Sequence, residues 1–110
     1  MKFNKSFRLL RASDYDFVFQ KPIKINHPLA SIYARPNACN HARIGLLVSK
    51  KAMKQAVARN RIKRIVRESF RAHVEQLKAY DIIYVARSSL QYADNKQVFS
   101  NLHELWAQLI

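Results

Sequence analysis

The segment from residue 56 to residue 71 concentrates the side chains best suited to bind a polyanion. It reads AVARNRIKRIVRESFR, in which six of the sixteen residues are Arg or Lys and only Glu68 is acidic. On a helical wheel the apolar side chains share one arc, and the opposite arc carries Asn60, Lys63, Arg64, Arg67 and Arg71. Like charges one turn apart on a helix repel by about 0.2–0.5 kcal/mol per pair. The pattern therefore favours a helix face that binds an anion over a face that is merely solvated.

Three aromatic residues indicate a second kind of contact. Tyr15 and Phe19 are spaced i, i+4 on an expected short helix, and Tyr33 lies in an expected strand. Such residues often belong to a core, but aromatic rings also stack on unpaired bases at about 1–3 kcal/mol each. The flanking sequence is basic, with Arg8, Arg11, Lys21 and Lys24. Core packing and a groove for single-stranded bases therefore both remain open.

The sequence disfavours metal-dependent and nucleophilic chemistry. The histidines are scattered, and Cys39 with His41 lacks the second close pair of ligands that is usual in a structural zinc site. The GxSxG, P-loop and HExxH motifs do not occur. Asp14 and Asp16 point apart on a helix, where they would mainly supply favourable charge at its N-terminus. We therefore expect neither a catalytic residue nor a metal site on this protein.

Length and charge describe a small basic domain. The 110 residues predict a single domain, 1–110, and 49% hydrophobic residues are enough for a core. The net charge of +13 points to nucleic acid or an anionic membrane. Residues 43–71 carry ten basic groups and one acidic group, whereas residues 72–110 carry three basic groups and four acidic groups. The positive charge is therefore expected on one part of the fold.

The sequence also predicts a location. No apolar run approaches the roughly 20 residues that span a bilayer, and the N-terminus is too charged for a signal peptide. The lone Cys39 cannot form an intrachain disulfide and suits a reducing compartment. We therefore expect a cytoplasmic protein with no membrane partner.

Periodicity and breaker residues predict a small sheet packed with helices. A capping box of Ser13 and Asp16 would open a helix over 14–20, and Pro22 and Pro28 would bracket a loop. Asp94 would cap a last helix whose core stripe is Val98, Leu102, Leu105 and Leu109. The other expected elements are strands at 29–35, 44–49 and 81–86 and a long helix at 56–77. The strand–helix–strand unit from 44 to 86 implies parallel pairing and an α+β or α/β class.

These motifs resemble the bacterial ribonuclease P protein subunit family. The segment VSKK at 48–51 precedes the basic helix, and Arg59-Asn60-Arg61 matches the RNR motif of that family. The resemblance extends to FRLLRASDYDFVF near the start, to the strands RIGLLVSKK and DIIYVAR, and to the final helix with Leu105-Trp106. It therefore covers nearly the whole chain.

The resemblance implies an α+β fold and a function. The fold would be a small mixed β-sheet packed with helices, like domain 2 of ribosomal protein S5, with a left-handed βαβ crossover. General chain topology would instead predict a right-handed crossover, as in about 98% of cases. The protein would bind ribonuclease P RNA, one protein per RNA. It would assist endonucleolytic removal of the 5′ leader from precursor tRNA, while the RNA supplies catalysis and holds the Mg²⁺.

The resemblance also assigns residues. The face that binds ribonuclease P RNA would comprise Lys50, Lys51, Arg59, Asn60, Arg61, Lys63, Arg64 and Arg67. The precursor tRNA leader would bind a cleft between the first helix and the sheet, lined by Tyr15, Phe19 and Tyr33. The connector 52–55 lacks a glycine that some family members carry, which leaves its geometry undetermined.

Three other functions fit parts of the pattern. A ribosomal or ribosome-assembly protein would share the basic helix and the location. A helix-turn-helix DNA-binding protein needs two consecutive helices, whereas strands flank this basic helix. A protein-only nuclease would need a clustered set of carboxylates, which the sequence lacks.

Overall fold

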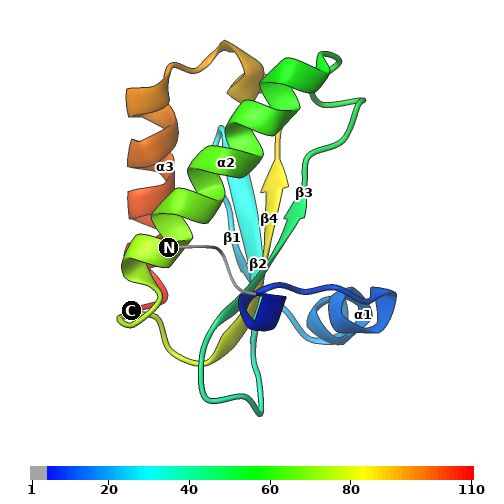
Figure 1. The fold of residues 1–110 in the computed structure, drawn as a ribbon, viewed down its shortest axis with the longest axis vertical. Coiled ribbons are helices and arrows are strands. Elements are labelled where there is room, and N and C mark those ends of the chain that lie inside the picture. The colour runs from blue at the N-terminus through cyan, green and yellow to red at the C-terminus, as the bar shows by residue number, and fades with distance from the viewer. Residues whose placement is uncertain (1–4) are drawn as a thin grey trace.

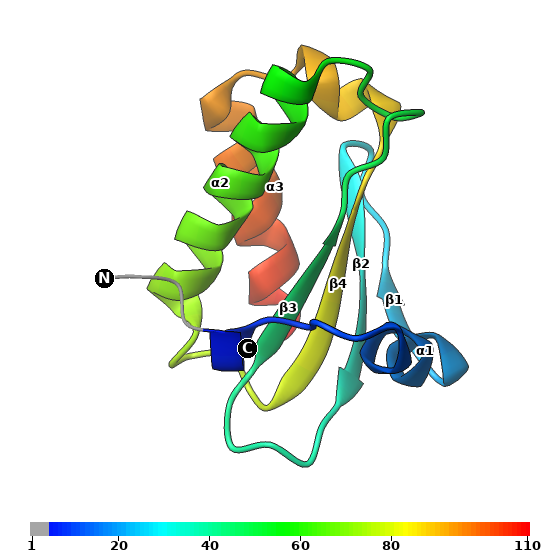
Figure 2. The same cartoon turned by 45° about the vertical axis from the view of Figure 1, so that its right-hand side comes forward.

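A four-stranded mixed sheet lies in the middle of the fold, with helices on both sides (Figures 1 and 2). The computed structural model describes residues 5–110. In chain order the elements are η1 (Lys5–Phe7), α1 (Ala12–Gln20), β1 (Ile23–Ile25), β2 (Ala30–Pro36), β3 (Arg43–Leu47), α2 (Ala56–His73), β4 (Tyr80–Ala86), η2 (Ser88–Tyr92) and α3 (Asn95–Ala107). The strand order is β1-β2-β4-β3, and β3 pairs with β4 in parallel while the other pairs are antiparallel. The predicted α+β class with a mixed sheet is confirmed.

The β3–α2–β4 unit connects two parallel neighbours through a crossover helix. Viewed from the side of α2 with both strands pointing up, the chain passes from β3 leftward to β4, so the crossover is left-handed (Figures 1 and 2). The general right-handed rule therefore fails here, and the expectation taken from the family resemblance is correct.

Strand β4 contributes to two separate apolar layers. Ile82 and Tyr84 face the large core beneath α2 and α3, whereas Ile83 faces a smaller cluster with Leu9 and Val18 beneath α1. Alternate residues of a strand point to opposite faces, and this strand is interior in the sheet. The strand predicted at 81–86 therefore lies inside the sheet and is covered on both faces.

The last helix begins where the sequence predicts. The Asp94 carboxylate accepts a hydrogen bond from the Gln97 amide at 2.8 Å, and the Gln97 side chain accepts one from the Asp94 amide at 2.9 Å. This reciprocal box satisfies amides that the first helical turn leaves open. The core stripe Val98, Leu102, Leu105 and Leu109 is buried as expected.

The first helix begins earlier than predicted. Its cap is the Asp14 carboxylate, which accepts hydrogen bonds from the amides of Leu10 at 3.2 Å and Arg11 at 3.1 Å. Helix α1 therefore starts at Ala12, and the expected capping box of Ser13 and Asp16 is wrong. The carboxylate at the third helical position accepts the amides that precede the helix.

Several other boundaries differ from the sequence prediction. The loop expected between Pro22 and Pro28 contains β1, which pairs with β2 from Ile23 opposite Ala34 to Ile25 opposite Ile32. Strand β3 stops at residue 47 instead of 49, α2 stops at residue 73 instead of 77, and η2 was not expected. Residues 1–4 lie outside the described chain, and residues 5–7 form a 3-10 turn.

Candidate nucleic-acid interface

Helix α2 divides its faces as the wheel predicts. Its buried residues are Ile62, Ile65, Val66, Ser69 and Phe70. Asn60 and Arg64 are exposed, while Arg59, Lys63 and Arg67 are half-buried. Lys50 and Lys51 are exposed in the turn that follows β3. The predicted RNA-binding residues therefore lie on the solvent side of α2 and on the segment that leads into it.

Two arginines of this set also hold the protein together. Arg59 donates hydrogen bonds to the carbonyls of Met53 and Lys54, both at 2.9 Å. Arg61 donates to the Ala93 carbonyl at 3.0 Å and to the Asn95 side chain. Arg59 thus fixes the connector before α2, and Arg61 fixes the start of α3. The wheel could not show these roles because the acceptors lie in other segments of the chain.

The first helix crosses the sheet above one row of paired residues. Lys24 pairs with Tyr33 across β1 and β2, and Ile83 of β4 pairs both with Tyr33 and with Gly45 of β3. Directly paired residues share a face of the sheet. We call the side of the sheet that carries this row, opposite α2 and α3, the open face.

Phe19 and Tyr33 form the exposed aromatic pair of the open face. Their ring centroids are 5.2 Å apart in an edge-to-face arrangement, and Phe19 is 43% exposed. The Lys24 ammonium lies 5.3 Å from the centroid of the Tyr33 ring. Leu47, on the same side of β3 as Gly45, is 40% exposed. The aromatic pair and a cation therefore lie together where unstacked bases could bind, and β3 adds apolar surface to the same face.

Tyr15 takes a different position from the aromatic pair. Its ring lies against Gly45, where an added Cβ would approach the Tyr15 hydroxyl oxygen to 2.6 Å. Burial raises the pKa of Tyr15, although a hydrogen bond with the backbone of Leu46 opposes that shift. The phenol therefore stays protonated at neutral pH. Tyr15 lies against the edge strand β3, whereas Phe19 packs against Tyr33 on β2.

Ionic contacts anchor α1 and the edge strand. Arg35 packs over the Phe17 ring, with its guanidinium carbon 4.0 Å from the centroid, and donates a hydrogen bond to the Phe17 carbonyl at 2.7 Å. Arg43 binds the buried Asp81 carboxylate through Nε at 2.8 Å and Nη2 at 2.7 Å, and lies 3.7 Å from Asp14. Hydrogen bonds to Asp81 raise the pKa of Arg43. These contacts hold the candidate interface in one geometry.

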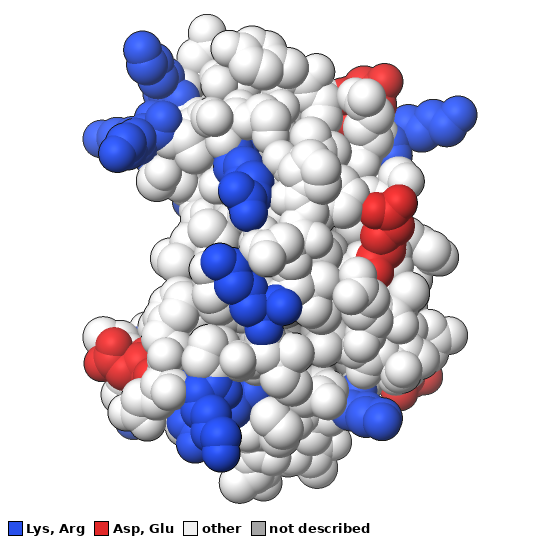
Figure 3. Space-filling view, turned by 180° about the vertical axis from the view of Figure 1, so that it is seen from behind, with Lys and Arg blue, Asp and Glu red and all other residues white. Residues whose placement is uncertain are grey.

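The positive charge extends beyond α2. Figure 3 looks from behind the view of Figure 1 and shows Lys and Arg at the top and spaced down the middle, with Asp and Glu toward the sides. An RNA strand could therefore contact cations on more than one face.

Two further properties bear on the function. Among residues 5–110, no three His, Cys, Asp or Glu side chains come together in a group that could hold a metal ion. None of the helices in that range is both long enough and apolar enough to cross a membrane.

Sequence reasoning overlooked Gly45 and gave Arg8 only a flanking role. Gly45 is the sole glycine of the chain and lies inside a strand, a placement that often marks a close approach of another group. That signal was available in the sequence. The position of Arg8 beside α2 had no local signal, because the two segments are more than 50 residues apart.

Known proteins are similar to this chain in sequence and in fold. A sequence model of the family described as Ribonuclease P matches residues 3–110. The ribonuclease P protein component of Histophilus somni strain 2336 is 44% identical over 108 residues, covering 98% of this chain and 91% of the relative. The protein of that name from Vibrio cholerae strain N16961 is 45% identical over 107 residues, covering 97% of this chain and 91% of the relative. A Staphylococcus aureus RNase P protein, a mutant with defective mRNA degradation activity, has a TM-score of 0.90 at 30% identity, covering 96% of this chain and 92% of that protein.

Proposed function

This chain belongs to the ribonuclease P protein family, and from that premise we propose that it binds ribonuclease P RNA and the 5′ leader of precursor tRNA. As a ribonuclease P protein component it is one part of an endoribonuclease that processes tRNA. The complex would remove the leader by hydrolysis of one phosphodiester bond and leave the mature 5′ end. We further propose a cytoplasmic complex with one protein per RNA.

The basic face of α2 would dock the protein on ribonuclease P RNA. A-form RNA hides its base edges in a deep, narrow groove, so proteins recognise it mainly through its backbone and shape. Exposed Arg64, Asn60 and Lys51 suit contacts with phosphate and ribose. Arg59 and Arg61 would stabilise the conformation of that surface through their hydrogen bonds to backbone carbonyls.

The open face would hold the leader. The main support for this proposal is the half-exposed Phe19–Tyr33 pair, which has the Lys24 ammonium beside it and lies where α1 packs across the sheet. A single-stranded leader offers unstacked bases to the rings and phosphates to the cation. The protein would bind substrate and reduce the repulsion between two polyanions, with release of counterions at each neutralised phosphate.

Catalysis would belong to the RNA, which would also hold the Mg²⁺. The carboxylates of this chain that face other groups already have structural roles. Asp81 binds Arg43, Asp14 and Asp94 cap helices, and Glu104 lies 2.7 Å from His27. These contacts hold the fold, and residues 5–110 contain no group of three His, Cys, Asp or Glu side chains that could hold a metal ion.

Reconstitution tests the proposal. The purified protein, added to a ribonuclease P RNA at low Mg²⁺, should restore cleavage of precursor tRNA at the mature 5′ end. Arg64→Gln should weaken binding to that RNA and reduce the salt slope of log K by about 0.7–0.9. Lys96→Gln, an exposed charge change on α3, is the matched control and should retain the wild-type slope.

Three outcomes would contradict the proposal. Capture of ribosomal RNA without ribonuclease P RNA from cells would favour a ribosomal role. Cleavage of precursor tRNA by the protein without RNA would favour a protein-only nuclease. Equal salt slopes for Arg64→Gln and Lys96→Gln would exclude Arg64 from the RNA-binding face.

A further inference from the structure

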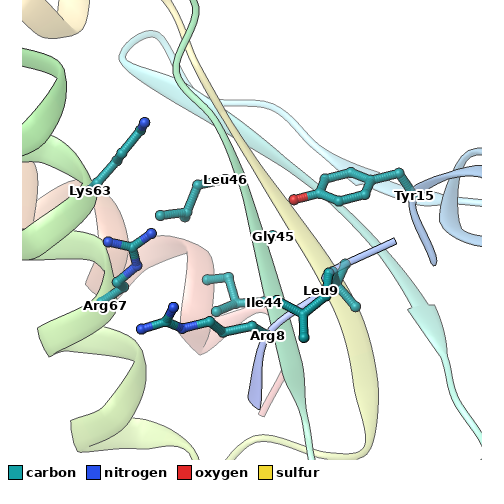
Figure 4. Close-up of a pocket in the computed structure, with 9 residues that line it drawn as sticks. Arg8, Leu9, Tyr15, Ile44, Gly45, Leu46, Lys63 and Arg67 are labelled. Carbon is teal, nitrogen blue, oxygen red and sulfur yellow. The ribbon is translucent and has the colours of Figure 1, made fainter. Parts of the chain in front are cut away.

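A pocket of about 190 Å³ lies at the outer edge of β3, between the basic face of α2 and the open face (Figure 4). Four polar side chains contribute to its wall. Its lining residues include Arg8, Tyr15, Lys63 and Arg67, with Leu9, Ile44 and Leu46 as the main apolar surface.

Three distant segments of sequence build this pocket. Arg8 follows η1 and bridges to Ile44 at the edge of β3, while the adjacent Leu9 amide donates to the Ile44 carbonyl at 2.9 Å. Lys63 and Arg67 come from successive turns of α2. Figure 4 shows the Arg8 guanidinium reaching toward α2, where it lies near that of Arg67, with the Lys63 ammonium further along the helix. The fold thus brings like charges together from opposite walls.

The guanidiniums of Arg8 and Arg67 act on each other as like charges. Burial lowers the pKa of Arg67, and the charge of Arg8 lowers it further. Both effects mean that the charged guanidinium loses solvation and meets a like charge. The Asp14 carboxylate accepts hydrogen bonds from the amides of residues 10 and 11 and lies near Arg43.

Tyr15 supplies a neutral donor on the other wall. Its hydroxyl points toward Leu46 and the pocket in Figure 4. Because the phenol remains protonated at neutral pH, its proton can be donated to an anion. Gly45 leaves the space that the ring needs in order to reach this position.

We propose that this pocket binds one phosphate group, which the Arg8 and Arg67 guanidiniums and the Tyr15 hydroxyl contact directly and the Lys63 ammonium attracts from the rim. Guanidinium forks match the paired oxygens of a phosphate. The apolar wall of Leu9, Ile44 and Leu46 would face the attached ribose. Within the proposed function, on which this assignment rests, the group is a backbone phosphate of RNA that passes from the α2 face to the open face.

The first experiment titrates the free protein with inorganic phosphate and follows the arginine Nε–Hε signals by NMR. The signals of Arg8 and Arg67 should shift and saturate with one phosphate per protein. Arg67→Gln should weaken binding by about tenfold or more, because a charge-assisted hydrogen bond contributes about 1.5–3 kcal/mol. Tyr15→Phe keeps the ring and removes only the hydroxyl, and should weaken binding several-fold, by about 0.5–1.5 kcal/mol.

A matched lysine pair separates the pocket from general positive charge. Lys63→Gln should weaken phosphate binding, whereas Lys96→Gln on α3 changes the net charge equally and should not. Equal weakening by both variants, or no saturation in the wild type, would overturn the proposal. Far-ultraviolet circular dichroism checks that each variant is folded.

The second experiment identifies the source of the phosphate. A single-stranded oligonucleotide receives a neutral methylphosphonate at one linkage at a time, and its affinity for the protein is measured. Loss of affinity at one linkage in the wild type, absent in Arg67→Gln, supports a backbone phosphate in the pocket. If the oligonucleotide does not displace bound inorganic phosphate, the backbone assignment is overturned and the site belongs to a free anion. Retained tRNA cleavage in that case would show that the proposed function stands without it.

Discussion

The two faces of the sheet differ in how they treat aromatic side chains. On the face beneath α2 and α3, which we call the closed face, Phe70 and Trp106 are fully buried with centroids 6.1 Å apart. On the open face Phe19 makes a similar edge contact with Tyr33 but is 43% exposed. One face of the sheet therefore buries its aromatic rings for stability, whereas the other leaves rings accessible to a ligand.

The polar groups follow the same division. On the closed face they pair with one another, since the Trp106 indole donates to the Ser69 hydroxyl at 2.9 Å and the Tyr84 hydroxyl donates to Asn101 at 2.9 Å. On the open face the Lys24 ammonium lies beside a ring, and two guanidiniums share the pocket at the sheet edge. Buried polar groups need such internal partners, whereas the exposed Lys24 ammonium remains accessible to a ligand.

Truncating one phenylalanine on each face should reveal the largest difference between the two faces in their contribution to stability. Phe70→Ala should lower the free energy of unfolding by about 3–5 kcal/mol, because it leaves a cavity in the closed face. Phe19→Ala should lower it by less than about 1 kcal/mol. Chemical denaturation of both variants measures these effects.

The same pair should show the opposite order in substrate binding. Phe19→Ala should weaken precursor tRNA binding by about 1–3 kcal/mol through lost stacking, with mature tRNA unaffected. Phe70→Ala, assayed at a temperature where it is folded, should bind both tRNAs nearly as the wild type does. Equal loss of both tRNAs in Phe19→Ala would assign Phe19 to the core.

Gly45→Ala should disturb the open face alone. A Cβ at this position meets the Tyr15 ring at 2.6–2.8 Å, so the ring must move. Overpacking of this kind costs about 1–3 kcal/mol of stability. The backbone itself gains no strain, because Gly45 does not have a positive φ.

A double variant sharpens this test. If displacement of the Tyr15 ring is the cause, Gly45→Ala in a Tyr15→Ala background should cost little further stability. An equal cost in both backgrounds would place the clash elsewhere. Urea denaturation of the four proteins completes the cycle.

The closed face should also make the stability of the protein depend on pH. Burial raises the pKa of Tyr84 well above its usual value of about 10. Above pH 10 the unfolded chain loses this proton while the folded chain keeps it, so the free energy of unfolding falls with pH. The contribution is up to about 1.4 kcal/mol per pH unit.

Tyr84→Phe removes that contribution. At neutral pH the variant should be less stable by about 1–3 kcal/mol, because Asn101 loses its hydrogen-bond donor. Between pH 10 and 11.5 its stability should fall less steeply than that of the wild type in parallel denaturation series. Parallel slopes would mean that Tyr84 ionises in the folded protein.

Local patterns predicted most elements but few of their ends. The i, i+4 stripe of α3 and its Asp94 cap are confirmed, because a cap and a stripe involve neighbours in sequence. The predicted start of α1 was wrong because the Asp14 carboxylate accepts the amides of Leu10 and Arg11, so the helix begins before Ser13. Strand β1 was missed because three residues are too few for a period and the pairing with β2 defines them.

The predicted site residues show the same limit. The wheel correctly placed Asn60 and Arg64 in solvent, since the buried arc of a helix follows from its own periodicity. It did not show that Arg59 and Arg61 bind backbone carbonyls, because those carbonyls belong to other segments. The RNA-binding and leader-binding assignments of these residues stay predictions.

The sequence by itself determined the amphipathic basic helix, the family motif around Arg59-Asn60-Arg61 and the α+β class. These properties depend on residue type and short spacing, which no tertiary contact changes. Only the folded chain shows that α1 lies across the sheet above the row that ends at Gly45 and that Arg8 lies near Arg67. Each of these depends on contacts between segments far apart in the chain, and such contacts exist only once the sheet has brought the segments together.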